Sequence, residues 1–470
     1  MSQSSESLYA SAEPIFPKRV KGKFRRLKWI IMAITLGIYY LVPWIRWDRG
    51  PNLPDQAVLV DLANRRFYFF WIEIWPHEFY FVAGLLIMAG LGLFLFTSAL
   101  GRVWCGYTCP QTVWTDLFMA VERWIEGDRN ARIRLHRANW SVKKVWLRSV
   151  KYVVWALIGV ATGGAWVFYF ADAPTLAASF LDLSAPPIAW ITVAILTATT
   201  VVLGGFLREQ VCIYMCPWPR IQGAMMDNDT LTVGYRDWRG EPRGKARDAN
   251  AGDCIDCNAC VAVCPMGIDI RDGQQLACIT CALCIDACDE IMDKVGRERG
   301  LIDYLALSDE PKERAGGKPT PAWRHILRPR TMLYTAIWGL IGLGMTYALF
   351  IRPDIEVTVA AVRNPTFVTL SDGAVRNTYE LRLRNKHGED RLFGIHLSGD
   401  LALSLSLQGT PYSSVEVPAN ETLRLRVYVT APADSETATG AEEPIRFWVE
   451  DLVNGERAAQ DSHFNGNGQG

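Results

Sequence analysis

The sequence predicts a multi-domain membrane protein, and three features of the 470-residue chain support this fold class. Five uncharged apolar stretches are each close to the length that crosses a bilayer as a helix. A polar segment with eight cysteines lies between the fourth and fifth stretches, and short segments typical of β-strands follow the fifth. We therefore expect a five-helix transmembrane bundle with an inserted cysteine-rich region and a C-terminal all-β sandwich of immunoglobulin-like type.

The transmembrane part is expected to begin after a polar, basic N-terminal segment, residues 1–28. The expected spans are 29–45, 79–100, 152–170, 188–207 and 331–351. Connecting loops complete the region 29–207. Because the number of spans is odd, the two ends of the chain should lie on opposite sides of the membrane.

The charges of the loops predict which parts of the chain lie on the cytoplasmic side of the membrane. Residues 101–151 are rich in Lys and Arg, whereas residues 171–187 contain Asp172 and Asp182 and no Lys or Arg. Cytoplasmic loops carry the excess of basic residues. We therefore expect a multi-pass protein of the bacterial inner membrane, with its N-terminus and residues 208–330 in the cytoplasm.

Residues 352–456 are expected to form the periplasmic sandwich. Short runs rich in Val, Leu, Tyr and Thr alternate with turn residues, and the expected strands are 355–362, 378–384, 401–407, 422–430 and 445–449. This region has no cysteine, so its core must be stable without a disulfide. The polar tail 457–470 is expected to be flexible.

The aromatic segment Phe67–Trp75 is too short to span a membrane. Trp and Tyr favour the level of the lipid headgroups, so we interpret this segment as interfacial, on the outer face. An alternative is that it lines a quinol pocket in which Glu73 accepts a proton.

The eight cysteines of the inserted region form two runs with the same spacing. They are Cys254, Cys257, Cys260 and Cys264, then Cys278, Cys281, Cys284 and Cys288. In bacterial ferredoxins with this spacing, three thiolates of each run bind one [4Fe–4S] cluster and the fourth binds the other cluster. The predicted sets are Cys254, Cys257, Cys260 and Cys288 for the first cluster, and Cys264, Cys278, Cys281 and Cys284 for the second.

Two structural zinc sites are the alternative for these cysteines, since zinc sites also use Cys-x-x-Cys pairs. Each run places its four cysteines within eleven residues, which is tighter than the usual zinc arrangement. The second run departs from the ferredoxin pattern at one position. Pro265 directly follows the last cysteine of the first run, whereas Asp289 directly follows the last cysteine of the second run. This position shapes a turn and supplies no ligand, so the prediction of two clusters is unchanged.

A second group of cysteines belongs to a duplicated motif, Cys-x-Tyr-x-Cys-Pro. Its members are Cys105 and Cys109 after the second span, and Cys212 and Cys216 after the fourth. The Pro that ends each motif suits the first turn of a following helix. The second cysteine of the motif would then lie beside the positive N-terminal end of that helix, which favours the thiolate form. Four thiolates at one membrane surface would form a soft site for Cu(I), zinc or an iron–sulfur cluster, and inert buried thiols are the alternative.

Three methionines lie close to the second motif in sequence: Met215, Met225 and Met226. Their thioethers could assist a copper ion, although ordinary packing is the more common role of methionine. All twelve cysteines lie in close-spaced groups, as expected for metal or redox thiols in a reducing compartment. The formal net charge is zero, which argues against a nucleic acid as a partner.

Taken together, this layout resembles the cytochrome c oxidase accessory proteins of the CcoG/FixG/RdxA group. The resemblance rests on the five spans, the two Cys-x-x-x-Cys-Pro motifs, the ferredoxin-type cysteines and the C-terminal sandwich. It implies a role in maturation of the cbb3-type cytochrome c oxidase, with that oxidase and its copper-delivery factors as partners beside the lipid membrane. It further implies that Cu(II) is reduced to Cu(I), with Cys105, Cys109, Cys212 and Cys216 as the candidate catalytic thiols.

The leading hypothesis is therefore a membrane-bound cupric reductase with two [4Fe–4S] clusters, fed by an unidentified electron donor. One alternative is a general ferredoxin-type electron-transfer subunit of a quinol-linked respiratory chain. Another is a non-catalytic scaffold for oxidase assembly, in which the clusters are structural.

Overall fold

The computed structural model describes residues 14–50, 52–246, 248, 250–353, 355–398 and 402–468. It divides into two compact units, one made of Met1–Ile45 with Gln56–Met345 and the other of Arg46–Asp55 with Thr346–Gly470. Parts of three predictions lie outside the described residues: 1–13 of the basic segment, Leu401 of one strand and 469–470 of the tail.

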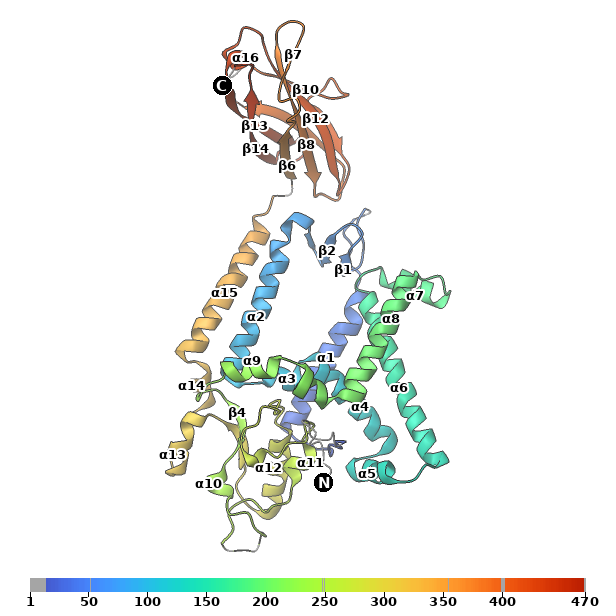
Figure 1. The fold of residues 1–470 in the computed structure, drawn as a ribbon, viewed down its shortest axis with the longest axis vertical. Coiled ribbons are helices and arrows are strands. Elements are labelled where there is room, and N and C mark those ends of the chain that lie inside the picture. The colour runs from blue at the N-terminus through green and yellow to red at the C-terminus, as the bar shows by residue number, and fades with distance from the viewer. Residues whose placement is uncertain are drawn as a thin grey trace, which may run out of the picture. The chain divides into compact units, whose positions relative to one another are not determined.

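Five helices of the described residues are long and apolar enough to cross a membrane (Figure 1). They are Lys23–Trp44, Pro76–Leu100, Val142–Val167, Pro187–Leu207 and Pro329–Phe350. Their α-helical parts are α1 (Lys23–Leu41), α2 (Tyr80–Leu100), α6 (Val142–Val167), α8 (Pro187–Thr200) and α15 (Pro329–Phe350).

Two of these helices extend beyond the apolar stretches seen in the sequence. Helix α1 begins at Lys23 and includes basic residues, and α6 begins at Val142 rather than at residue 152. The charged first turns of α6 are stabilised locally, because Ser141 caps the helix and the ammonium group of Lys144 donates to the carbonyl of His136 at 3.0 Å. The apolar stretch of a sequence shows only which part of a helix suits lipid. The helix itself can be longer, because its backbone hydrogen bonds also form where the side chains are polar.

Several short helices connect the long ones. The helices are α3 (Val103–Tyr107), α4 (Pro110–Glu126), α5 (Arg129–Arg137) and α9 (Trp218–Met225). Helix α8 continues as a π-helix, η3 (Val201–Leu207), and a second π-helix, η4 (Val211–Met215), contains Cys212. π-Helical turns are rare and frequently occur at functional sites.

The cysteine-rich region is built on two small helices and a two-stranded sheet. These are α11 (Ala259–Val263), α12 (Leu283–Val295), β4 (Thr232–Tyr235) and β5 (Ile302–Leu305). Ile285, Met292 and Leu301 form part of its buried core. Helices α10 (Asp237–Gly240), α13 (Glu310–Arg314) and α14 (Ala322–Ile326) complete this part of the chain.

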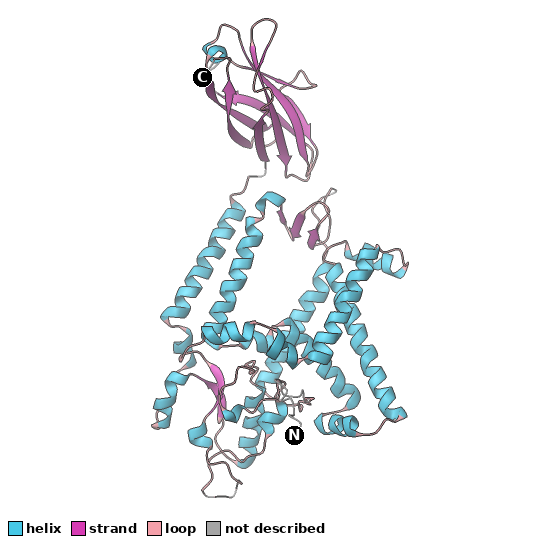
Figure 2. Cartoon of the chain, viewed as in Figure 1, coloured by secondary structure: helices cyan, strands magenta, loops and turns pink. Residues whose placement is uncertain are grey.

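The C-terminal unit is a sandwich of two antiparallel sheets, and Figure 2 shows that strands dominate it. One sheet contains β6 (Ile355–Ala361), β7 (Val368–Thr369), β8 (Val375–Asn385), β10 (Ser404–Leu407) and β12 (Thr422–Ala431). The other contains β9 (Arg391–Ser398), β11 (Ser414–Val417), β13 (Glu442–Asp451) and β14 (Arg457–Asn465). Tyr379 of the first sheet packs on Phe447 of the second, with ring centroids 5.0 Å apart.

The prediction of a flexible tail from residue 457 is wrong. Residues 457–465 form β14, which pairs with β13 over nine residues from Glu442 to Glu450. Phe464 is fully buried in the core between the sheets. The segment is polar because the other side chains of this edge strand are largely exposed, so composition alone did not reveal the strand.

The aromatic segment Phe67–Trp75 is part of a three-stranded antiparallel sheet. Its strands are β1 (Val58–Asp61), β2 (Arg66–Phe69) and β3 (Ile72–Ile74). The carboxylate of Glu73 pairs with Arg66 at 3.1 Å, so its charge is compensated inside the sheet. Glu73 thus contributes an ion pair to the sheet, and the quinol alternative stays a prediction.

Candidate functional site

Two small cavities in the cysteine-rich region are lined by cysteines of both runs. One is lined by Cys254, Cys257, Cys260 and Cys288. The other is lined by Cys264, Cys278, Cys281 and Cys284, and Cys260 also touches it. Each cavity thus combines three cysteines of one run with the last cysteine of the other, because α11 and α12 pack together in one core.

The backbone has the same unusual conformation in both cysteine loops. The residues on either side of Cys257, Asp256 and Asn258, have φ values of 51° and 54°. The residues on either side of Cys281, Thr280 and Ala282, have φ values of 54° and 59°. Non-glycine residues rarely adopt this left-handed conformation, and it is maintained where the surroundings enforce a particular loop shape.

The first loop is fixed by Arg271, whose guanidinium group pairs with Asp256 and Asp269, both at 2.6 Å. These ion pairs raise the pKa of Arg271, and its positive charge in turn partly offsets the effect of burial on the pKa of Cys260. Arg271 therefore both shapes the loop and places a cation beside a candidate ligand.

The cysteines of both cavities fit iron–sulfur clusters. Burial raises the pKa of Cys260 and Cys278 to about 11, and that of Cys264 and Cys288 to about 12. Such thiols lose their protons readily only when a metal compensates the charge. The residues that would hold two [4Fe–4S] clusters are the two sets that line the cavities.

Zinc and a four-iron cluster would use four thiols in different arrangements. Within the described parts of the chain, no three His, Cys, Asp or Glu side chains converge as ligands of one metal ion would. Zinc requires its ligand atoms at about 2.0–2.3 Å. A four-iron cluster, by contrast, holds each thiolate at a different iron, so its four cysteines stay farther apart.

The second group of cysteines lies where the two duplicated motifs meet. Cys105 is in α3, and Cys109 is the residue before α4, whose first turn begins with Pro110. Cys212 is in η4, and Cys216 comes two residues before α9. Burial, followed by the proximity of the other three thiols, raises the pKa of Cys212 to about 12. The four thiols therefore form one group.

Hydrogen bonds hold this four-thiol group (Cys105, Cys109, Cys212 and Cys216) against the long helices. The thiol of Cys105 donates to Oε1 of Gln222 in α9 at 3.1 Å, and Gln222 donates to Thr97 of α2 at 3.2 Å. The hydroxyl of Thr112 donates to the carbonyl of Cys105 at 2.6 Å. The first motif is thereby connected to α9, which follows the second motif, and to a long helix.

The four-thiol group also adjoins the second cysteine cavity. A Cβ atom on Gly106 would lie 2.6 Å from the carbonyl oxygen of Ile279 and 3.0 Å from the Cα of Cys281. The hydroxyl of Tyr107 donates to the carbonyl of Cys281 at 3.1 Å. Cys105 and Cys212 pack against the same apolar cluster as Cys281. The two groups of cysteines are therefore in direct contact through the backbone.

Arg102 lies between these two groups. Its side chain is almost fully buried and donates a hydrogen bond to the carbonyl of Leu276. Burial raises the pKa of Cys105, and the positive charge of Arg102 opposes this effect. Arg102 also lines a cavity that reaches Met226 and Cys278. Its positive charge favours the ionised forms of both Cys105 and Cys278.

The three methionines near the second motif have different surroundings. Met215 is 60% exposed, Met225 is buried in α9, and Met226 lines the cavity next to Arg102. Nothing in their contacts brings the three thioethers to one point.

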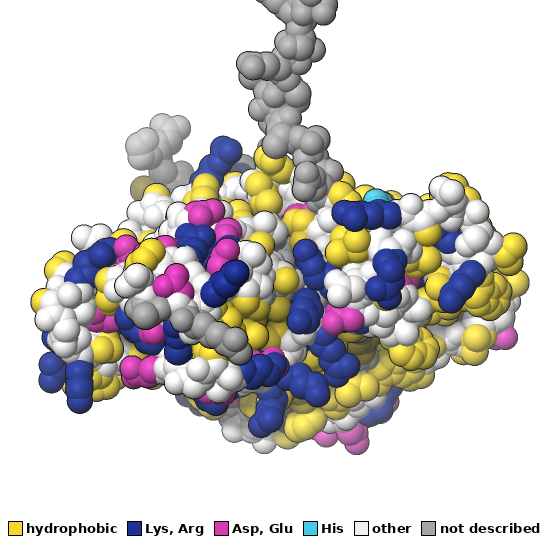
Figure 3. All heavy atoms as spheres, turned by 90° about the horizontal axis from the view of Figure 1, so that it is seen from below, with side chains coloured by type: hydrophobic (Ala, Val, Ile, Leu, Met, Phe, Trp, Pro, Cys, Tyr) yellow, Lys and Arg dark blue, Asp and Glu magenta, His cyan; other side chains and the backbone are white. Residues whose placement is uncertain are grey.

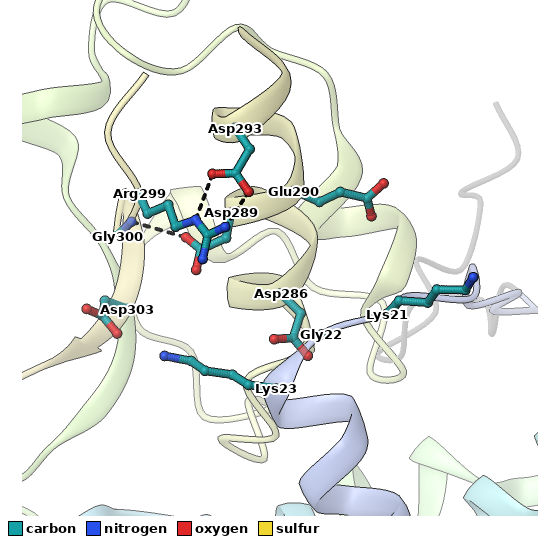
Figure 4. A pocket seen from close by; sticks show the side chains of 10 residues that line it. All are labelled: Lys21, Gly22, Lys23, Asp286, Asp289, Glu290, Asp293, Arg299, Gly300 and Asp303. Atoms are coloured by element: carbon teal, nitrogen blue, oxygen red, sulfur yellow. Dashed lines mark hydrogen bonds and ion pairs between the residues drawn. The ribbon is translucent and has the colours of Figure 1, made fainter. Parts of the chain in front are cut away.

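Helix α12 also connects the cysteine-rich region to α1. Asp286 accepts hydrogen bonds from the backbone N–H groups of Phe24 and Arg25, at 3.2 and 2.7 Å, and so caps the N-terminus of α1. Figure 4 shows Asp286 facing Gly22 at the edge of a charged pocket. Asp289, the residue that departs from the ferredoxin pattern, accepts the N–H of Gly300 at 3.1 Å. A proline there would lie inside α12, where its missing N–H would disrupt the helix.

Sequence reasoning did not single out Gly106, Arg102, Gln222 or Asp286. Gly106 lies within the first Cys-x-Tyr-x-Cys-Pro motif, and Arg102 lies shortly before it. Their closeness to this motif in the sequence could therefore have identified them as candidates. Gln222 and Asp286 act on partners more than a hundred residues away, and no local pattern marks them.

Three family profiles match the chain. They are described as "4Fe-4S binding domain" over residues 81–130, "4Fe-4S dicluster domain" over residues 207–307, and an "IG-like fold at C-terminal of FixG" over residues 345–467. A crystal structure of a FixG-related protein from Vibrio parahaemolyticus is 24% identical and aligns with a TM-score of 0.22, covering 25% of this chain and 99% of that one.

Full-length relatives are much more similar. Protein RdxB of Cereibacter sphaeroides is 65% identical, covering 99% of this chain and 98% of the relative. Protein RdxA of the same organism is 64% identical, covering 95% of each chain. Nitrogen fixation protein FixG of Rhizobium meliloti is 54% identical, covering 97% of this chain and 94% of the relative. With its iron–sulfur domains, its apolar helices and this full-length similarity, the chain belongs to the FixG/RdxA family of iron–sulfur electron-transfer proteins.

Proposed function

We propose that this protein is a membrane-bound cupric reductase that supplies Cu(I) for assembly of the copper centre of a cbb3-type cytochrome c oxidase. The observation that carries the proposal is the contact between Gly106 and the backbone of Cys281. It joins the ferredoxin-type cysteines to the four-thiol group at the membrane surface. The oxidase and its copper-delivery factors are the proposed partners.

The chemistry requires one electron for each copper ion. When bound, each [4Fe–4S] cluster accepts and releases a single electron. The two cysteine sets would hold these clusters, and the contacts of Gly106 and Tyr107 with Cys281 fix the four-thiol group beside the second set. An external one-electron reductant supplies the electron, Cu(II) gains it to become Cu(I), and soft sulfur ligands favour the reduced ion.

We further propose that the cysteine-rich region faces the cytoplasm and the sandwich faces the periplasm. Lys and Arg side chains are spread over the face of the molecule seen in Figure 3. The basic segment 101–151 and the acidic loop 171–187 give the same orientation by the positive-inside rule. Clusters would then be loaded in a reducing compartment, and the sandwich would be available to a periplasmic partner.

The test is an anaerobic turnover experiment on the full-length protein in detergent or nanodiscs. The cluster-loaded protein is reduced with dithionite, freed of excess reductant and mixed with Cu(II). Cluster reoxidation is followed by absorbance while a chelator captures Cu(I). We expect one Cu(I) for each electron lost by the clusters, and a slower reaction in the double variant Cys105→Ala with Cys212→Ala.

The matched control is Thr108→Ala, which lies between the two thiols of the first motif. The hydroxyl of Thr108, the group that this variant removes, donates a long hydrogen bond of 3.4 Å to the carbonyl of Trp104, so the variant should react at the normal rate. Reduced clusters that persist in the presence of Cu(II) would overturn the proposal. The general electron-transfer subunit and the assembly scaffold would then be the remaining candidates, separated by whether a respiratory quinol reduces the clusters.

A further inference from the structure

We propose that the basic end of α1 binds an anionic phospholipid, whose phosphate group lies in a cavity formed by α1 and α4. The site contains no cysteine, and its assignment stands whether or not copper is the substrate of the protein. It names the class of lipid that the protein holds at one defined place.

The cavity has a volume of about 710 Å³, which is within the usual range of ligand pockets. Its walls come from the segment before α1, the first turns of α1 and the second half of α4. Five of the lining residues are basic, and none of the described lining residues is acidic. The basic residues are Arg19, Lys21, Arg25, Arg26 and Arg123. A cavity with this lining suits an anion.

Two of these arginines have buried N–H groups for which the described part of the chain offers no acceptor. Arg25 is only 6% exposed, and its Nη1 donates to Asp116. The Nη2 of Arg25 and the Nε of Arg123 are buried and have no hydrogen-bond partner among the described residues. Such groups are rare in folded proteins. The two arginines therefore have donors to spare for the oxygen atoms of a phosphate.

The positive charge at this site is only partly compensated. Three cations, Lys28, Arg25 and Arg123, act on the one buried carboxylate of Asp116. Burial, followed by the charge of Arg25, lowers the pKa of Arg123. A second carboxylate, Asp128, also acts on Arg123, but Asp128 is exposed to solvent, which weakens its effect. A phosphate diester in the cavity would supply a further negative charge.

The surroundings of the cavity favour a lipid over a free phosphate ion. Trp29 and Trp124 line the cavity and are 39% and 81% exposed. Tryptophan is enriched at the level of the lipid headgroups. Helix α1 is long and apolar enough to cross a membrane, and its Ile30 and Ile34 are 50% and 55% exposed, so acyl chains could contact them. Basic pockets beside membrane helices bind the headgroups of anionic lipids.

The cavity also adjoins the cysteine-rich region. Lys21 and Gly22 line both this cavity and the charged pocket beside α12. Asp286 of α12 accepts the backbone N–H of Arg25 at 2.7 Å. A lipid bound to Arg25 would therefore hold the start of α1 at the place where the membrane helices meet the cysteine-rich region.

The experiment measures lipid binding to delipidated full-length protein by native mass spectrometry. Phosphatidylglycerol is the probe. Phosphatidylcholine has the same phosphate diester but no net charge, and inorganic phosphate is an anion without acyl chains. We expect one phosphatidylglycerol molecule to bind at least about tenfold more tightly than phosphatidylcholine. Equal binding of the two lipids overturns the proposal, as does displacement of phosphatidylglycerol by an equimolar amount of inorganic phosphate.

The test variant combines Arg26→Gln with Arg123→Gln. Arg26 is exposed and the Nε of Arg123 has no partner among the described residues, so the fold should persist. Binding of phosphatidylglycerol should weaken about thirtyfold, since each basic side chain near an anionic lipid contributes about fivefold. The matched control, Arg134→Gln with Arg137→Gln in α5, removes the same charge from exposed positions outside the cavity and should bind as the parent does. An equal loss in both variants indicates general attraction and overturns the site.

A second measurement uses the unaltered protein and does not depend on whether a variant folds. Phosphatidylglycerol with a diazirine in its headgroup is added to the protein in nanodiscs and activated by light, and the labelled residues are located by mass spectrometry. Labelling concentrated at residues 19–29 and 120–124 supports the site. Labelling spread evenly over the basic segments of the chain overturns it.

Discussion

The backbone of Gly106 lies so close to that of Cys281 that a Cβ atom at position 106 would be 3.0 Å from the Cα of Cys281. Alanine normally stabilises a helical position relative to glycine. In α3 we expect the opposite: Gly106→Ala should destabilise the protein by about 1–3 kcal/mol through overpacking. Thermal unfolding followed by tryptophan fluorescence measures this change.

The control for this variant is Gly90→Ala in α2, where the added methyl group would meet nothing within 4 Å. This variant should be as stable as the parent protein or slightly more stable. If Gly106→Ala were equally well tolerated, the close contact between the two groups of cysteines would not exist in solution.

The crossing of ligands between the two runs can be tested with pairs of Ser substitutions. Cys254 and Cys288 line the same cavity, whereas Cys254 and Cys264 line different ones. Replacing Cys254 and Cys288 together should therefore impair one cluster, and replacing Cys254 and Cys264 together should impair two. We expect the first variant to retain about four more iron atoms in each chain. The reverse order would indicate that each run binds its own cluster.

A buried ion pair connects α4 to the start of α1. Asp116 accepts two hydrogen bonds from Arg25, both 2.9 Å, and Lys28 lies 3.9 Å away. All three side chains are at most 7% exposed. Asp116→Asn would leave two buried cations without their carboxylate, so we expect a loss of about 3–5 kcal/mol of stability.

This effect should depend on pH. Burial alone would raise the pKa of Asp116, but Lys28 and Arg25 outweigh burial and lower it. A carboxylate whose pKa is lower in the folded state stabilises the fold above its unfolded pKa of about 3.9, and this contribution disappears as the pH falls further. The difference in the free energy of unfolding between Asp116→Asn and the parent protein should thus have its full size at pH 7 and become smaller below about pH 4.

The control is Glu290→Gln, which removes an exposed ion pair with Lys294. This variant should lose at most about 1 kcal/mol of stability.

The proposed orientation predicts the behaviour of reporter fusions. Alkaline phosphatase requires disulfides, which form in the periplasm and not in the cytoplasm. A fusion after Gly470 should be active, and a fusion after Gly317, in the segment before α15, should be inactive. Fluorescent protein fusions at the same two positions should show the opposite pattern. Activity after Gly317 would contradict the cytoplasmic placement of the cysteine-rich region.

Much of this protein could be predicted from local patterns. The five apolar stretches correspond to the five long helices, although α6 begins earlier because a helix does not end where its side chains become polar. Strands β6, β8, β12 and β13 were visible as alternating apolar runs. Strand β14 was missed because Phe464 is its one fully buried side chain, too weak a signal for an edge strand.

The sequence by itself determined the spacing of the cysteines in each run, and this spacing predicts the kind of group that the loop can bind. Only the tertiary structure decided which other parts of the chain contact these cysteines. Tyr107 and Cys281 are 174 residues apart, and their hydrogen bond exists because α3 packs against the loop before α12. Contacts of this kind depend on the fit of complete surfaces, which no local spacing encodes.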